Sequence, residues 1–153
     1  MSDASLAAQL QRIFDDEIPL TRAMALRVDQ YDGQALALSV PLENNINDKA
    51  TAFGGSLYSM CVLSGWGLLT LTLKSHDLKG DIVIQDSQIQ FLKPLRSERL
   101  AVRCAFAEPQ QVDEFVSVYQ QRGKARRELV AEILADGETA VRFTGRYVAL
   151  KAD

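Results

Sequence analysis

The chain has 153 residues, of which 47% are hydrophobic and 24% charged, the composition of an ordinary globular domain with a sizeable core. A formal net charge of -3 argues against a nucleic-acid-binding surface, and the first 17 residues lack the basic and then apolar pattern of a signal peptide. We therefore expect a single domain, residues 1–153, in the cytoplasm and not in a membrane. Cys61 and Cys104 show no CxxC pairing, so we expect two reduced core cysteines and neither a metal nor a cofactor.

The chain begins with a predicted amphipathic helix that Pro19 closes. Its apolar residues recur at helical spacing: Leu6, Leu10, Ile13 and Phe14. Strands are predicted at residues 25–31 and 35–41, with Asp32 and Gly33 between them, a dipeptide typical of hairpin turns.

Residues 45–73 join a polar loop, a glycine pair and a long apolar run. No charged residue lies between Thr51 and Leu73, and apolar or small residues cover every side of the predicted helix, the pattern of a helix enclosed by its own protein. The run also has the roughly 20 residues that a membrane-spanning helix requires. Because glycine, serine and threonine dilute it and no basic cluster flanks it, we favour the enclosed helix.

Four more strands are predicted beyond this helix, at residues 82–92, 100–107, 129–134 and 139–150. A second amphipathic helix is inserted near residues 109–122, and Gly123 ends it. The order of elements predicts an α+β architecture in which an antiparallel sheet wraps around one long helix.

Three segments carry a resemblance to a known family: the loop NINDKATAFGGSL, the strand end IQFLKPL and the closing stretch RGKARRELVAEILADGETAVRFTGRYVAL. With the order of elements, they resemble the hotdog-fold thioesterase superfamily, and within it the YiiD C-terminal type. The resemblance implies a homodimer whose sheets pair edge to edge, and possible assembly into a tetramer. It also implies acyl-thioester sites at the subunit interface, where an acyl-CoA or an acyl-carrier-protein (acyl-ACP) thioester is hydrolysed.

Gly54 and Gly55 stand at the predicted start of the central helix, where unpaired N–H groups meet the positive end of the helix dipole. A tight turn packed against backbone would explain a glycine pair equally well. Thioester hydrolysis, however, needs donors at the carbonyl oxygen, and one such N–H can be worth roughly 3 to 4 kcal/mol in the transition state. The resemblance therefore favours a catalytic role, with the Gly55 N–H as the first candidate.

Asn47 lies six residues before Phe53, where related thioesterases carry an Asn followed by His-Gly-Gly in place of this Phe-Gly-Gly. The resemblance implies that Asn47 orients the substrate or a water molecule. Asn44 and Asn45 could serve as well, although asparagines in such loops more often make turns. Further residues are expected to border the substrate: Asn45, Thr51, Phe53, Ser56, Tyr58 and Val62.

Relatives usually carry an acidic residue nine positions beyond the one aligned with Phe53, and this chain has Val62 there. Valine has no ionisable group and cannot act as a general acid or base. Nearby candidates are Tyr58, Ser59, Ser64 and Asp86, and only Asp86 offers a carboxylate. A carboxylate in a largely apolar strand must contact solvent, be hydrogen-bonded or be functional, so Asp86 is either the general base or a structural residue.

Gly123, Lys124 and Arg126 are similar to the loop by which related enzymes hold the phosphates of CoA, although a solvated strand edge would look alike. His76, the only histidine, is expected in a solvated loop, which counts against a hydratase or dehydratase of this fold. Two functions stay open: a thioester hydrolase, and a module that binds acyl-CoA without turning it over. Val62 keeps the second open.

Overall fold

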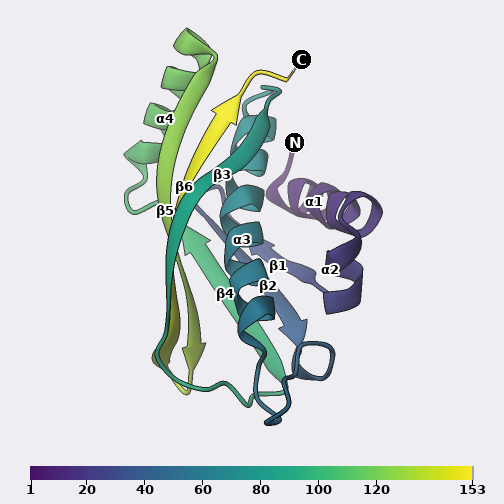
Figure 1. Ribbon diagram of the computed structural model, residues 1–153. Coiled ribbons are helices and arrows are strands. Elements are labelled where there is room, and N and C mark those ends of the chain that lie inside the picture. Colours follow the sequence, from purple (N-terminus) through teal and green to yellow (C-terminus); the bar gives the residue numbers. More distant parts are fainter. Residues whose placement is uncertain (153) are drawn as a thin grey trace.

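The computed structural model describes residues 1–152, and its elements follow the predicted order (Figure 1). The helices are α1 (Asp3–Glu17), α2 (Pro19–Met24), α3 (Gly54–Ser75) and α4 (Gln110–Arg122), with a 3-10 turn η1 (Leu42–Asn44). The strands are β1 (Arg27–Tyr31), β2 (Ala35–Pro41), β3 (Asp81–Phe91), β4 (Arg99–Ala105), β5 (Lys124–Ala135) and β6 (Glu138–Leu150).

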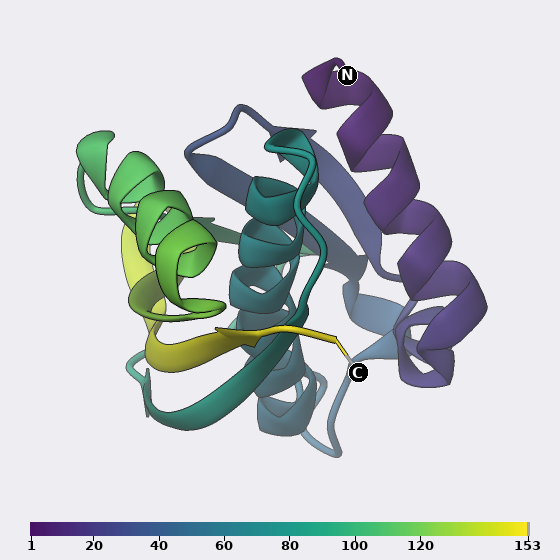
Figure 2. The same ribbon diagram turned by 90° about the horizontal axis from the view of Figure 1, so that it is seen from above.

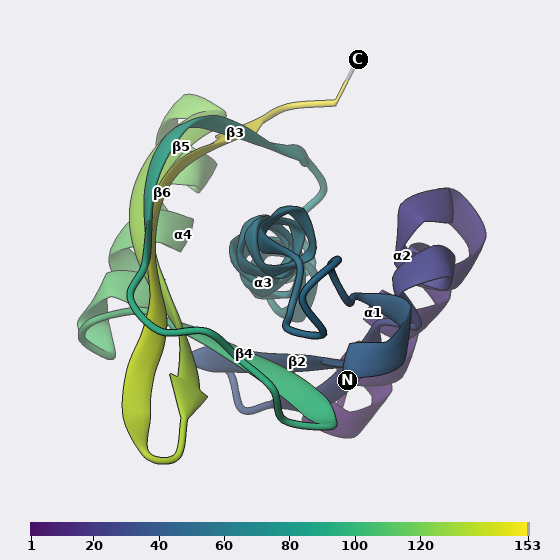
Figure 3. The ribbon, with the colours of Figure 1, turned by 60° about the horizontal axis from the view of Figure 1, so that its bottom comes forward.

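The six strands form one antiparallel sheet in the order β1-β2-β4-β5-β6-β3. Seen along α3, the sheet curls around this helix, while α1 and α2 lie on the other side of it (Figure 3). From above, α4 lies beside α3 on the side opposite α1 (Figure 2). The predicted sheet wrapped around a long helix, with an N-terminal and an inserted helix, is confirmed.

The helix α3 is the core of the fold, and its two buried polar side chains, Ser64 and Thr72, are satisfied within it. Ser64 donates to the Cys61 carbonyl at 2.7 Å, and Thr72 donates to the Leu68 carbonyl at 2.8 Å. The helix is long and apolar enough to cross a membrane, but 67% of its apolar window is buried inside the fold, as in the core helix of a folded domain. The expectation that it is enclosed on every side is wrong along one stripe, which is only partly covered: Gly55, Ser59, Val62, Trp66 and Thr70.

Two boundaries differ from the prediction for identifiable reasons. Pro19 does more than close α1, because proline suits the first turn of a helix and here begins α2. This short helix ends at Met24 and is capped by Ala25, whose φ of 55° is left-handed, so β1 begins only at Arg27. Strand β5 begins at Lys124, five residues before the predicted start, because its charged first residues pair with β6 although they lack an apolar pattern.

Cys61 and Cys104 are both free and fully buried, as predicted for reduced core residues. Burial raises the pKa of each thiol to about 12, so neither ionises near neutral pH. They therefore act as small apolar side chains of the core.

Candidate active site at the start of the central helix

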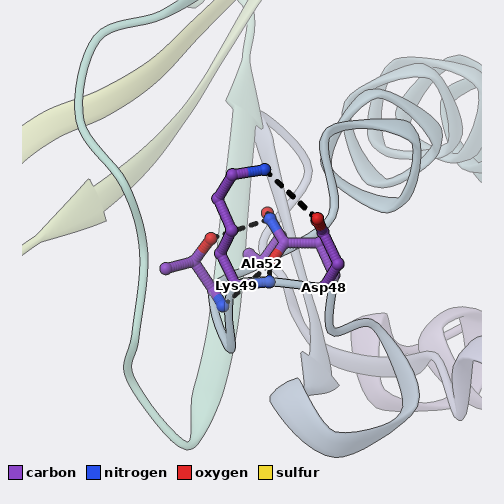
Figure 4. A network of polar contacts seen from close by, with 5 residues as sticks. Asp48, Lys49 and Ala52 are labelled. Atoms are coloured by element: carbon purple, nitrogen blue, oxygen red, sulfur yellow. Dashed lines mark hydrogen bonds and ion pairs between the residues drawn. The ribbon is translucent and has the colours of Figure 1, made fainter.

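The loop before α3 is closed by the side chain of Asn47. Its amide oxygen accepts the N–H groups of Lys49 at 2.8 Å and Thr51 at 3.0 Å, while its amide nitrogen donates to the Thr51 hydroxyl at 2.8 Å and to the Ala52 carbonyl at 3.4 Å. Figure 4 shows this network, in which Lys49 also reaches the carboxylate of Asp48 at 3.3 Å. The hydrogen bonds of the Asn47 side chain thus hold the loop in its conformation, and the buried Thr51 contributes to the same network.

Asn45 anchors the same loop to the body of the protein. Its amide nitrogen donates to the carbonyls of Met24 at 3.0 Å and Pro41 at 2.8 Å, and its backbone carbonyl accepts the Phe53 N–H at 2.8 Å. The side chain is buried, and its amide oxygen has no hydrogen-bond partner among residues 1–152. Asn45 therefore fixes the backbone of Phe53, the residue that caps α3.

The first turn of α3 offers free N–H groups, as the glycine pair predicted. Phe53 caps the helix with extended backbone and without a side-chain bond, and its carbonyl accepts the N–H of Leu57 at 3.1 Å. Within the described part of the chain, the N–H groups of Gly54, Gly55 and Ser56 have no acceptor. They are the unpaired donors that every helix start leaves, and they can meet a ligand oxygen.

Aromatic rings flank both glycines. A Cβ placed on Gly55 would lie 2.5 Å from the ring of Phe53, so this ring packs directly on the glycine. A Cβ on Gly54 would lie 3.6 Å from the ring of Phe91, an ordinary contact distance. Phe53 and Phe91 are both about half exposed, so their rings form the solvent-facing apolar surface around the start of α3.

A hollow of about 260 Å³ opens beside Gly54, between the loop and the end of β3. Its lining is apolar except for one lysine: Ala52, Gly54, Leu57, Phe91, Leu92, Lys93, Pro94 and Leu95. The buried residues Leu57 and Leu95 form the floor, and Lys93 pairs with Glu138 at the rim. Such a hollow suits an apolar group that reaches the helix start.

Tyr58 lies one turn further along α3 and reaches across to the sheet. Its hydroxyl lies 2.7 Å from the hydroxyl of Ser87 on β3, and its ring meets the edge of Phe143 at a centroid distance of 5.9 Å. Val62 follows after one more turn and is partly exposed, while its backbone carbonyl accepts a bond from the buried Tyr147 hydroxyl at 2.8 Å. The sequence did not single out Ser87.

The structure does not bring Asp86 to this site. Its carboxylate is exposed and is held by Arg146, whose Nε donates to it at 2.7 Å, across from it on β6. This guanidinium holds the pKa of the Asp86 carboxyl below its ordinary value. Because Ser87 faces α3 and neighbouring residues of a strand point to opposite faces, Asp86 lies on the outer face of the sheet. The geometry does not support Asp86 as a general base.

The basic residues predicted to hold phosphates lie at the far end of the molecule. Gly123 ends α4 with a φ of 68°, and Lys124 and Arg126 follow on β5 around a hollow of about 530 Å³ that Arg122 also lines. In Figure 1, α4 lies toward one end of α3, and the loop that leads into α3 lies at the other end. Within one chain these cations and Gly54 do not meet. His76 is exposed at the end of α3, as expected.

Comparison with known proteins agrees with this architecture. The family described as "Putative thioesterase (yiiD_Cterm)" matches residues 7–151 of the chain. A protein of unknown function from Chlorobaculum tepidum is 31% identical, with a TM-score of 0.93 over 99% of this chain and 98% of that chain. A "putative thioesterase" from Shewanella oneidensis is 29% identical, with a TM-score of 0.82 over 96% of this chain and 98% of that one.

A more distant likeness concerns the fold alone. The Escherichia coli PaaI protein, from the phenylacetic acid degradation operon, is 13% identical, with a TM-score of 0.69 over 99% of this chain and 98% of that chain. These likenesses confirm the predicted hotdog fold. Since the family match spans residues 7–151, the chain belongs to the YiiD C-terminal family, which is described as "Putative thioesterase".

Proposed function

We propose that the protein hydrolyses an acyl thioester of coenzyme A or of acyl carrier protein, by attack of water on the thioester carbonyl. The observation that carries this proposal is the set of three free N–H groups at the start of α3, next to an apolar hollow that Gly54 lines. The carbonyl oxygen would lie against the N–H groups of Gly54 and Gly55, and the acyl group would lie in the hollow. Donors fixed in this way can contribute roughly 3 to 4 kcal/mol to the transition state.

The site we propose works without a carboxylate. None of the residues that line the hollow is acidic, Val62 is apolar, and Asp86 pairs with Arg146 on the other face of the sheet. Catalysis would therefore rest on preorganised neutral donors and on the placement of water. Asn47 enters as a positioning residue that shapes the loop, with Asn45 and Thr51 beside it in the same network.

We further propose that the working unit is a homodimer joined along β3. This strand is 11 residues long, and no strand of residues 1–152 pairs with its outer edge. Long unpaired edges invite pairing with another strand, and β3 exposes Val83 and Phe91 besides the charged Asp86 and a bulge. A second copy of the chain, paired antiparallel, would satisfy this edge.

Such a dimer would also unite the two halves of a substrate site. Lys124 lies beside Leu150, and Leu150 lies beside Asp81 at the start of β3, whereas Gly54 lies against Phe91 at its end. The ten residue steps of β3 span roughly 33 Å at about 3.3 Å each, too far for one small group.

Antiparallel pairing would set the start of the partner's β3 beside the end of the first. Lys124 and Arg126 of one protomer would then lie toward the glycine pair of the other, where they would hold the phosphates of the substrate. Gly123 would shape this basic turn.

A thioesterase assay tests the proposal. The protein is incubated with a panel of acyl-CoA and acyl-ACP thioesters, free thiol is measured, and calorimetry measures binding of the same ligands. Thiol release that exceeds the uncatalysed rate supports the hydrolase. The lack of a carboxylate favours a second candidate, a module that binds acyl-CoA in the cytoplasm, and binding without thiol release from any thioester would establish it in place of the hydrolase.

A further inference from the structure

The hydroxyl groups of Tyr58 on α3 and Ser87 on β3 connect the central helix to the edge strand. The oxygens of Tyr58 and Ser87 are 2.7 Å apart, a distance typical of an O–H···O hydrogen bond. The Tyr58 ring meets the edge of the fully buried Phe143 at an interplanar angle of 70°, and this contact fixes the direction of the phenol. The pair is thus held in place by packing as well as by its own bond.

This pair retains unused hydrogen-bonding capacity. Each hydroxyl has one donor hydrogen and acceptor lone pairs, and the bond between them consumes only one hydrogen and one lone pair. Neither hydroxyl has another partner among residues 1–152, and Tyr58 is 36% exposed. A water molecule needs two to four polar partners, and the pair offers it one free hydrogen and free lone pairs.

The pair stands next to the glycines on the helix surface. Tyr58 follows Gly54 by four residues and Gly55 by three, and residues at these spacings are neighbours on one face of a helix. The Phe53 ring packs on Gly55, whereas Gly54 meets only the Phe91 ring at ordinary contact distance, so the space beside Gly54 can admit a ligand.

The other polar side chains of the first helical turns are less well placed. The Ser59 hydroxyl donates to the Gly55 carbonyl at 2.9 Å, and Ser56 lies on the side of the helix that carries the buried Met60. Val62 offers no polar group, and Asp86 faces outward beside Arg146. The hydroxyl pair is therefore the polar side-chain group best placed to meet a reacting molecule at the helix start.

We propose that Tyr58 and Ser87 are catalytic residues that hold the attacking water for the thioesterase reaction proposed above, on which this inference rests. The water oxygen forms a bond to the thioester carbonyl carbon, the carbon–sulfur bond breaks, and its electron pair leaves on sulfur. One proton of the water stays on the carboxylic acid, and the other ends on the sulfur as the thiol. The pair orients the water and undergoes no net change.

The test compares Tyr58→Phe, Ser87→Ala and the double variant with the wild type in the thiol-release assay. Tyr58→Phe keeps the ring on Phe143, so the melting temperature should stay within a few degrees. Each single change should lower kcat roughly tenfold, the equivalent of one lost hydrogen bond, with KM within about twofold. The kcat of the double variant should lie within about twofold of the kcat of the less active single variant, because the two hydroxyls act as a unit.

Gln88→Ala is the matched control, since Gln88 is exposed on the same strand and adjacent to Ser87. It should keep the wild-type kcat. Wild-type kcat in Tyr58→Phe and Ser87→Ala, or losses that multiply in the double variant, would overturn the inference and leave the proposed thioesterase intact. A wild type that releases no thiol would overturn both.

Discussion

Gly54 allows one N–H group to be removed without disturbing the fold. Proline is favoured at the first position of a helix, which Gly54 occupies, because an N–H there has no partner within the helix. The residue before a proline must be extended, and Phe53 already is, with φ of -71° and ψ of 128°. We therefore expect Gly54→Pro to fold normally while it deletes a donor that the proposed site uses.

The structure also supplies the matched control. In Gly54→Ala the added Cβ would meet only the Phe91 ring, at 3.6 and 3.7 Å, which is ordinary van der Waals contact. Alanine is a better helix former than glycine by up to about 1 kcal/mol, so this variant should be as stable as the wild type or slightly more stable. This variant keeps the N–H group and adds only a Cβ, at the position that the proline Cβ would take.

The two variants separate the donor from the space around it. Loss of one donor from an oxyanion site typically lowers kcat by about 10² to 10³-fold, so Gly54→Pro should lose at least tenfold more activity than Gly54→Ala. Thiol release and urea unfolding are measured on both. If the two variants lose the same activity, the Gly54 N–H is not a catalytic donor. If both retain wild-type activity, the carbonyl lies elsewhere.

Three further predictions rest on the same structure. Asp86→Asn should leave kcat unchanged, because the carboxylate faces away from α3; a tenfold loss of thiol release would restore it as a general base. Gly65→Ala should destabilise the protein by about 1 to 3 kcal/mol in urea unfolding, because the new Cβ would overlap the buried Tyr147 ring. Burial raises the pKa of Cys61 and Cys104 to about 12, whereas the pKa of an unfolded cysteine is near 9. The protonated thiols therefore contribute fully to the free energy of unfolding below pH 9, and this contribution is lost as the pH rises toward 12. Stability should fall by about 1.4 kcal/mol per cysteine per pH unit above 9, and the double Cys→Ala variant should lack that part of the loss.

The fold was predictable because its elements carry strong periodic patterns. The uncharged run between Thr51 and Leu73 identified α3, and apolar residues at helical spacing identified α1 and α4. The sequence does not predict the short helix α2, because six residues give no readable period and Pro19 after an amphipathic helix indicates a stop.

The inner face of β3 could not be predicted because a bulge changes its side-chain alternation. Counted by twos from Ile82 and Ile84, Asp86 should point inward with them. The pairing with β6 shifts between Ile84 and Asp86, and an extra residue at that point reverses which side chains face inward. Ser87 consequently takes the inner position beside Tyr58, and nothing in the local sequence marks that shift.

The loop before α3 was predicted as a site by its resemblance, while its internal bonds were beyond sequence analysis. An asparagine can hold a ligand or close a turn, and the residue type does not distinguish these uses. In the structure the Asn47 amide is bonded on both its oxygen and its nitrogen to its own loop. The part of the loop that remains available is backbone, at Gly54 and Gly55.

A site built from backbone donors and apolar walls depends on its substrate to complete it. An N–H donor stabilises developing negative charge more strongly where water is excluded, and here Phe53 and Phe91 stay about half exposed in the free protein. An acyl group that fills the hollow beside Gly54 would cover the Phe91 ring and displace water from the donors. The binding energy of the acyl group would then appear in kcat as well as in KM, because it creates the environment that the transition state needs. Discrimination between acyl groups would thus arise at the walls of the site, although no wall residue takes part in the bond-breaking step.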